Sequence, residues 1–260
     1  MPEDSLSNKH SKLLMDKFHD SAGVPWEGRK FSDSPFADDD GSTPPALAKV
    51  LQAERLDKKE LFYALSQSRL LIPLLATLRE SEIGPFGQVV DKSADLSVVA
   101  VATPDNQSAL PVFSSVQQMQ AWNASARPVP VDSRRVALAA VAEGHNRVVL
   151  DPSTRSIGLR RPFLAALAQG HDWTPPHNNE TVIGLLAQEV KKSSTISNVE
   201  LLDPDPEGKL LTSELLISLT MVPGLSPQTL REILEELTIR IQTEQFLALV
   251  DSISYRVVSA

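Results

Sequence analysis

The sequence contains no cysteine among its 260 residues. This absence excludes disulfide bonds, cysteine-based zinc fingers, iron–sulfur clusters and a thiol nucleophile. We expect no cofactor, because no residue pattern in the chain predicts one. A chain without cysteine fits the reducing environment of the cytoplasm, which is where we expect this protein to be found.

Long hydrophobic runs are also missing. The longest extends from Leu70 to Leu78 and is interrupted by Pro73 and Thr77, whereas a membrane-spanning helix needs about 20 apolar residues. Residues 1–20 mix Lys, Asp, Glu and His without an apolar stretch, which is not the pattern of a signal peptide. We therefore expect no membrane partner.

Positive charge is scarce and scattered. Lys and Arg number 25 against 33 Asp and Glu, so the net charge is −8. Proteins that bind nucleic acids usually present a basic face that releases phosphate counterions. Here the basic residues cluster only in the pairs Arg134-Arg135, Arg160-Arg161 and Lys191-Lys192. We interpret these pairs as solvated surface and predict no nucleic-acid partner.

The remaining composition is sufficient for folded domains. Hydrophobic residues make up 42% of the chain, and its length exceeds the ~100–200 residues typical of one domain. Helical and strand patterns both occur, so we predict an α+β fold: two small mixed sheet-and-helix domains preceded by a largely disordered tail. The predicted boundaries are a flexible acidic tail at 1–43, an α+β domain at 44–173 and a ββαβ-type α+β domain at 180–260.

Apolar periodicity, caps and breakers predict the order of the elements. In the first domain we expect a helical region after Pro44-Pro45 broken near Asp57, a strand over 70–76, a hairpin of 96–103 with 109–114, a helix ending near Trp122, a helix from Asp132 to Gly144, a hairpin of 147–150 with 156–159, and a helix from Pro162 to about Gln169. In the second we expect a helix over 181–191, strands over 198–202 and 210–221, a helix beginning at Ser226, and a strand over 253–258.

Three aromatic residues stand out in the polar tail: Trp26, Phe31 and Phe36. A docked aromatic ring buries about 150–250 Å², so we predict that this segment forms a partner-docking arm together with Asp38, Asp39 and Asp40. The three carboxylates also suggest a cation site, but adjacent acids in a polar tail are usually solvated. We favour the solvated interpretation for the carboxylates.

Five phrases in fixed order resemble the SseB N-terminal-domain family in its actinobacterial form. They are PWEGRKF…PFADDDGSTPPAL (25–47), SRLLIPLLA (68–76), ALPVFSSVQQMQAWNASARPVPV (109–131), RRVALAAVAEGHNRVVLDP (134–152) and LRRPFLAALAQGHDW (159–173). The family is named for enhanced serine sensitivity. The resemblance implies an α+β fold and a cytoplasmic protein, but no established activity or catalytic residues. Residues 180–260 are similar in outline to the family's C-terminal region.

The residues from Asp203 to Glu214 reproduce the spacing of an EF-hand calcium loop. Asp203, Asp205, Glu207 and Glu214 occupy ligand positions, and Gly208 occupies the position of the sharp turn. However, the two prolines of the loop fit such a site poorly, and the segment that follows is strand-like. We therefore interpret the loop as a hairpin connection and predict no metal site.

Histidines suggest two further sites, each with a simpler explanation. His171, Asp172 and His177 supply potential zinc ligands, but His145 would have to complete the set through the fold. Glu143 beside His145 would suit a general base, but a helix end followed by a polar turn accounts for both. We favour the simpler interpretation in both cases and assign no catalytic, cofactor-binding or metal-binding residues.

These observations favour a non-enzymatic interaction or regulatory module. Its expected partner is another protein or a further copy of the chain, of unknown identity. The alternative is a small-molecule sensor that binds an amino-acid-like ligand, and an enzyme is the least favoured option.

Overall fold

The computed structural model describes residues 35–77 and 95–260. It divides into two compact units, residues 1–40 and 41–260. In the first unit, residues 35–40 contain a turn in which the backbone N–H of Asp39 donates to the carbonyl of Phe36 at 3.2 Å. The rest of the predicted tail before residue 35, including Trp26 and Phe31, lies outside the described residues. In the second unit helices and sheets are mixed, which confirms the α+β fold.

The second unit begins with two helices whose ends follow from the sequence. Helix α2 (Pro45–Gln52) starts with proline in its first turn, where the missing N–H costs no hydrogen bond. Helix α3 (Lys58–Ser66) is capped by the Asp57 carboxylate, which accepts from the backbone N–H groups of Lys59 and Glu60. The predicted break near Asp57 is thus confirmed as a helix start.

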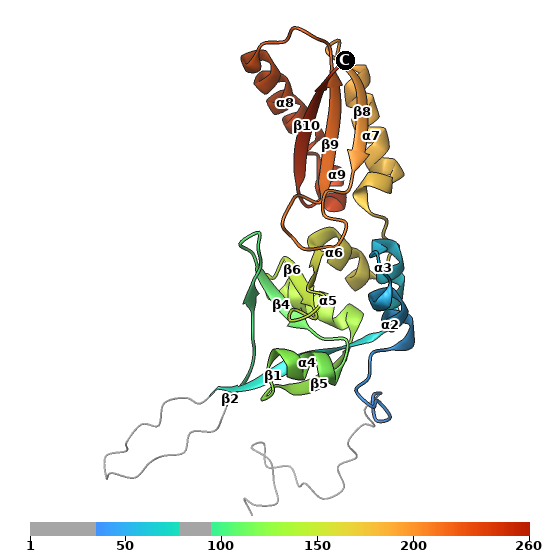
Figure 1. Ribbon diagram of the computed structural model, residues 1–260, viewed down its shortest axis with the longest axis vertical. Helices are drawn as coiled ribbons and strands as arrows, with labels where there is room; N and C mark the ends of the chain where they lie inside the picture. The colour runs from blue at the N-terminus through green and yellow to red at the C-terminus, as the bar shows by residue number, and fades with distance from the viewer. Residues whose placement is uncertain (1–34, 78–94) are drawn as a thin grey trace, which may run out of the picture. The chain divides into compact units, whose positions relative to one another are not determined.

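Two sheets organise the first half of this unit (Figure 1). One has the order β2-β1-β5, built from β1 (Arg69–Thr77), β2 (Asp95–Val98) and β5 (Arg127–Asp132), all antiparallel. The other has the order β3-β4-β6-β7, built from β3 (Val101–Ala102), β4 (Ser108–Val112), β6 (Arg147–Leu150) and β7 (Ile157–Arg160). Strands β4 and β6 run parallel, and the other neighbours are antiparallel.

Three further helices accompany these sheets. They are α4 (Val116–Trp122), α5 (Ser133–Ala142) and α6 (Arg161–Gln169). Ser115 caps α4 and Asp132 caps α5, as the sequence predicts. Gly144 follows α5 with a φ of +77°, a conformation that glycine adopts without strain.

The core of this half contains an aromatic cluster. The ring of Phe163 lies 5.1 Å from that of Phe62 and 4.9 Å from that of Trp173, both edge-on. All three side chains are buried together with the apolar residues of α2, α3, α5 and α6. Trp173, placed by sequence at the end of the domain, is therefore part of its core. A smaller core contains Phe113.

The second half of the unit is a three-stranded sheet with helices on one face (Figure 1). Its elements are the 3₁₀ turn η2 (Pro176–Asn178), α7 (Glu180–Lys191), β8 (Ile196–Leu202), β9 (Leu215–Met221), α8 (Pro227–Ile241), α9 (Glu244–Leu249) and β10 (Ile253–Ser259). The sheet order is β10-β9-β8, with β8 antiparallel and β10 parallel to β9. Strand β10 is thus an edge strand.

Side-chain alternation along β9 explains why helices cover only one face. Leu215, Ile217 and Leu219 are fully buried in a core shared with α7 and α8. The opposite face carries a polar row in which Arg256 donates to Ser218 and pairs with Glu200. Because successive residues of a strand point to opposite faces, one sheet holds both a core and a solvated surface.

Two predicted strands were wrong in their extent. Residues 96–103 do not form one hairpin strand: β2 pairs with β1, and only Val101 and Ala102 pair with β4. Residues 210–214 are not part of β9, which begins at Leu215. Helix α9 and strand β5 were not predicted. None of the helices among the described residues is long and apolar enough to cross a membrane.

Candidate functional site

The loop between β8 and β9 packs against the first half of the unit. The backbone N–H of Gly158 in β7 donates to the carbonyl of Gly208 at 2.7 Å. The Leu210 side chain lies directly over Gly158, where an added Cβ would be 2.3 Å from the leucine Cγ. The antiparallel pairing of β8 with β9 confirms the predicted hairpin, and its connection also joins the two halves.

Ion pairs surround this contact. Arg160 pairs with Asp205 at 3.0 Å, and both side chains are more than nine-tenths buried. Arg147 pairs with Asp251 at 2.6 Å and with Asp105 at 2.9 Å. A buried charge is tolerated when it is paired and hydrogen-bonded. The two arginines of the first half are therefore matched to carboxylates of the second half.

The carboxylates of the calcium-like spacing point to different partners. Asp203 pairs with Lys58 at 2.7 Å, and Asp205 accepts from the backbone N–H of Leu210 in addition to Arg160. Glu214 accepts from the backbone N–H of Asp251 at 2.6 Å. No group of three or more potential metal ligands occurs within residues 35–77 and 95–260. The acids of the loop therefore bind groups of the first half and of Asp251 rather than a common ion.

We call the contact of the 203–214 loop and Asp251 with Lys58, Arg147 and Arg160 the junction. Within it, the pKa of Glu214 is strongly shifted. The pKa of its carboxyl is raised from 4.5 to about 7, chiefly by burial, to which the negative charge of Asp251 adds. The hydrogen bond from Asp251 and the charges of Arg160 and Lys58 act in the opposite direction. Glu214 therefore changes its protonation near neutral pH while almost completely buried.

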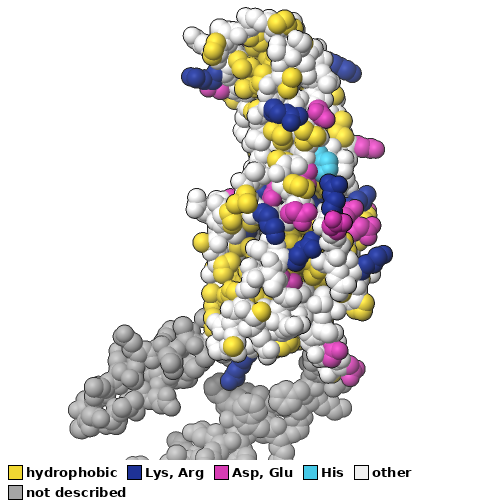
Figure 2. Space-filling view, in the orientation of Figure 1, with side chains coloured by type: hydrophobic (Ala, Val, Ile, Leu, Met, Phe, Trp, Pro, Cys, Tyr) yellow, Lys and Arg dark blue, Asp and Glu magenta, His cyan; other side chains and the backbone are white. Residues whose placement is uncertain are grey.

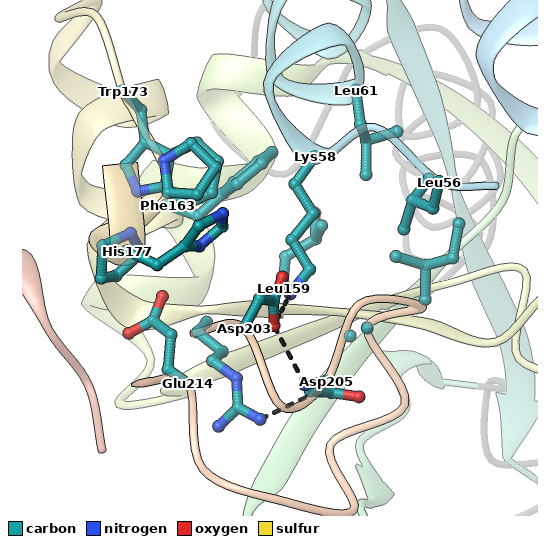
Figure 3. A pocket seen from close by; sticks show the side chains of 16 residues that line it. Leu56, Lys58, Leu61, Leu159, Phe163, Trp173, His177, Asp203, Asp205 and Glu214 are labelled. Carbon is teal, nitrogen blue, oxygen red and sulfur yellow. Dashed lines mark hydrogen bonds and ion pairs between the residues drawn. The ribbon is translucent and has the colours of Figure 1, made fainter. Parts of the chain in front are cut away.

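A small cavity lies beside this cluster, and Figure 3 shows Lys58, His177, Asp203 and Glu214 around it. The volume open to the centre of a water-sized sphere is about 30 Å³, which is room for one or two water molecules. Trp173 Nε1 and His177 Nδ1 are buried there with no hydrogen-bond partner among the described residues. Burial also lowers the pKa of His177, which favours the neutral ring.

The residues named as potential zinc ligands do not form a group of three or more potential metal ligands within the described part of the chain. His171 and Asp172 are exposed, whereas His177 lines the cavity. His145 lies 3.0 Å from the Ser108 hydroxyl through Nδ1 and 3.7 Å from Glu143 through Nε2. In the turn at 35–38 and just beyond, Phe36 and Asp39 are half-buried and Asp38 and Asp40 are exposed. The predicted docking arm is otherwise outside the described residues.

A second candidate site is a groove between α8 and the edge strand β10. It is lined by Pro227, Leu230, Arg231, Leu234, Glu235, Thr238, Ile239 and Tyr255, and its volume is about 680 Å³. Ile239 is 76% exposed although it is a large apolar side chain. Figure 2 shows hydrophobic side chains gathered over this end of the molecule. We call this groove and the free edge of β10 the α8–β10 surface.

Comparison with known proteins identifies the first half. Residues 45–166 match the family described as SseB protein N-terminal domain. The chain carries an SseB N-terminal domain. No curated protein and no solved structure matches the chain. The SseB domain thus contains the aromatic pair Phe62 and Phe163 and both junction arginines, whereas the α8–β10 surface lies outside the matched residues.

Sequence analysis found only part of each of the two candidate sites. The hairpin loop was singled out for its acids, but Arg160, which pairs with Asp205, was interpreted from the sequence as solvated surface and is instead buried. Arg147, which pairs with Asp251, gave no signal in the sequence. The groove had a weak signal, because Ile239 falls on the polar side of the otherwise regular pattern of α8.

Proposed function

We propose that this chain is a non-enzymatic, cytoplasmic interaction module, and that it binds a protein partner through the α8–β10 surface. The observation that carries the proposal is the combination of an exposed apolar groove with an adjoining strand edge that no described strand pairs with. Edge strands present free N–H and C=O groups, and natural proteins usually block or cover them. An extended partner segment would add a strand to β10 and cover the groove.

The junction supports the same choice by contrast. Its charged side chains are engaged with one another, and the cavity beside Glu214 accommodates only one or two water molecules. A wider depression of about 610 Å³ is lined by Arg147, Arg160 and Asp251, whose charges are already paired. The absence of cysteine, and the net charge of −8 with scattered Lys and Arg, accord with a cytoplasmic protein that does not bind nucleic acids.

A site-specific photocrosslinker tests the proposal. Replacing Ile239 with a photoreactive phenylalanine analogue should yield a covalent adduct with another protein or with a second copy of the chain. Leu211 is the matched control, because it is 73% exposed and lies outside the groove. Adducts in native extract or with purified protein at position 239, but not at 211, would support the proposal. Equal yields at the two positions would overturn it.

A small-molecule sensor is the second candidate, and one observation favours it. Trp173 Nε1 and His177 Nδ1 are buried at the cavity without partners among the described residues, and a shallow depression beside the cavity shares Lys58, His177 and Asp203 with it. A ligand with hydrogen-bonding groups would satisfy these nitrogens. A thermal-shift screen with amino acids would raise the melting temperature of the wild type but not of Trp173→Phe.

A further inference from the structure

We infer that the partner on the α8–β10 surface is a second copy of this chain, with β10 paired antiparallel to β10 across a two-fold axis. This inference rests on the proposed function and names its partner. A two-fold interface uses the same surface on both copies, so that surface has to be complementary to itself. The backbone, the helix register and the charges of the α8–β10 surface each meet that requirement.

The backbone groups on the free edge are defined by the pairing on the other side. The N–H of Ala260 donates to Met221, and the carbonyl of Ser252 accepts from Leu215, both on β9. In a parallel pair, alternate residues direct both backbone groups to the same neighbour. The even-numbered residues of β10 therefore face β9. Residues 253, 255, 257 and 259 present their N–H and C=O groups to the free edge.

One position of the two-fold axis along β10 suits the backbone groups of this edge. With the axis at Val257, Val257 pairs with Val257 of the second copy, and Tyr255 pairs with Ser259 of that copy. Both pairs join residues whose backbone groups face the edge. Arg256 then lies opposite Val258 rather than opposite another Arg256. An axis at Arg256 would place two like charges in register, which destabilises an antiparallel pair.

The position of α8 agrees with this axis. The hydroxyl groups of Thr238 and Tyr255 lie 2.9 Å apart, which fixes the level of the helix against the strand. Helix α8 connects two parallel strands, so it runs antiparallel to β10. Two strand residues rise about 6.6 Å, equal to roughly four helical residues. Val257 is therefore level with about Leu234, and two copies of α8 would lie antiparallel on either side of the axis.

The charges of the groove complete the argument. Arg231 and Glu235 both line the groove, and neither side chain has a hydrogen-bond or ion-pair partner within the part of the chain that the structure describes. Other charges of α8 are engaged: Arg240 pairs with Glu236 and Glu189, and Glu232 accepts from Gln228. Arg231 and Glu235 are symmetric about residue 233, close to the level of the axis. Each would meet the opposite charge of the second copy, giving the same ion pair twice.

Charge reversal tests the inference on the full chain by analytical ultracentrifugation. The wild type should sediment as a dimer that dissociates on dilution. Arg231→Glu and Glu235→Arg should each weaken dimerisation on the order of tenfold, because each places two like-charge pairs at the axis. The double variant R231E/E235R should restore it. An equimolar mixture of the two single variants should form a heterodimer, since one copy then carries two acids and the other two arginines.

Glu232→Arg is the matched control, because Glu232 lies on the same helix but does not line the groove; it should leave dimerisation unchanged. Thermal unfolding of each variant confirms that it is folded. A wild type that stays monomeric, single variants that dimerise like the wild type, or a mixture that does not associate would each overturn the inference. If the purified wild type is monomeric but the crosslinker at position 239 captures a different protein, the inference falls and the proposed function stands. Without capture, both fall.

Discussion

The two halves of the 41–260 unit differ in how they treat apolar surface. The SseB domain buries the rings of Phe62 and Phe163, which pack with Trp173 just beyond the matched residues, and α5 and α6 pack against the sheet. The second half buries one face of a three-stranded sheet but leaves an edge strand open and Ile239 exposed beside it.

The two halves therefore use their apolar side chains differently. In the SseB domain the aromatic pair of Phe62 and Phe163 contributes to folding, because both rings are removed from water within the same chain. In the second half, part of the apolar surface contributes nothing to the folded unit alone and becomes useful when something covers it. The region beyond the residues matched by the family therefore carries the exposed surface on which the proposed contact rests.

The largest expected loss of stability comes from a substitution in the core of the SseB domain. Phe163→Ala should lower the free energy of unfolding by about 3–5 kcal/mol, because a buried ring is replaced by a cavity between two other rings. Chemical denaturation measures it. Tyr63→Ala is the control on a neighbouring aromatic residue that is 39% exposed, and it should cost about 1 kcal/mol or less. Equal losses would contradict the assignment of Phe163 to the core.

The next effect concerns the junction and depends on pH. The folded pKa of Glu214 is about 7 against 4.5 for a free carboxyl, so between these values the unfolded chain has lost a proton that the folded chain keeps. The contribution of Glu214 to stability should therefore fall as pH rises through this window, by on the order of 3 kcal/mol. Urea denaturation at pH 4.5 and pH 8 measures it.

Replacing the carboxyl checks the origin of that dependence. Glu214→Gln should remove this contribution, so that the variant gains stability relative to the wild type as pH rises. Glu207→Gln, in the same loop but about half exposed, should leave the pH dependence as it is. An unchanged slope in Glu214→Gln would show that another group is responsible.

A smaller effect tests the steric fit between the halves. Gly158→Ala should lower the free energy of unfolding by about 1–3 kcal/mol, because the added methyl overlaps the buried Leu210. Gly184→Ala has open space within helix α7 and should instead stabilise the protein by about 0.5–1 kcal/mol. Opposite signs in thermal unfolding would confirm that the loop is seated on β7, and a neutral Gly158→Ala would refute it.

The smallest expected change in stability comes from the exposed Ile239, which is compared with a buried isoleucine of the same helix. Ile239→Lys should change the free energy of unfolding by no more than about 0.5 kcal/mol when measured at a concentration at which the protein is monomeric. Ile241→Ala, two residues away and buried, should cost about 2–5 kcal/mol. If the exposed isoleucine proved as costly as the buried one, the α8–β10 surface would belong to the core.

Helices and short local pairs were predictable because their signals are local. Ser115, Asp132 and Ser226 each cap a helix as the sequence indicates, and the predicted break near Asp57 is the start of α3. The hairpins of β6 with β7 and of β8 with β9 follow from breakers between apolar runs. Each of these features depends on residues that are close together in the chain.

Other features escaped because local signals opposed them or carried no information about distant partners. Strand β5 contains Pro128 and Pro130, which argue against a strand, but it lies at a sheet edge, where proline is tolerated. Residues 96–103 have one uninterrupted β pattern, yet their two ends pair with different strands. The candidate sites were hardest, because the junction joins residues such as Arg147 and Asp251 that no sequence pattern links. The domain boundaries and the aromatic docking arm stay predictions.

The pair of Arg147 and Asp251 spans 104 positions of the chain. A ribosome adds residues in order at about 5–20 per second, so roughly 5–20 s separate the synthesis of the two partners. During that interval the nascent SseB domain carries two guanidinium groups that will later be buried, and these can be hydrated only while the domain stays open on that side. The final hairpin and strand can therefore cover the two guanidinium groups only after translation has passed both partners. A chain stopped before Asp251 would expose the cationic side of its own junction.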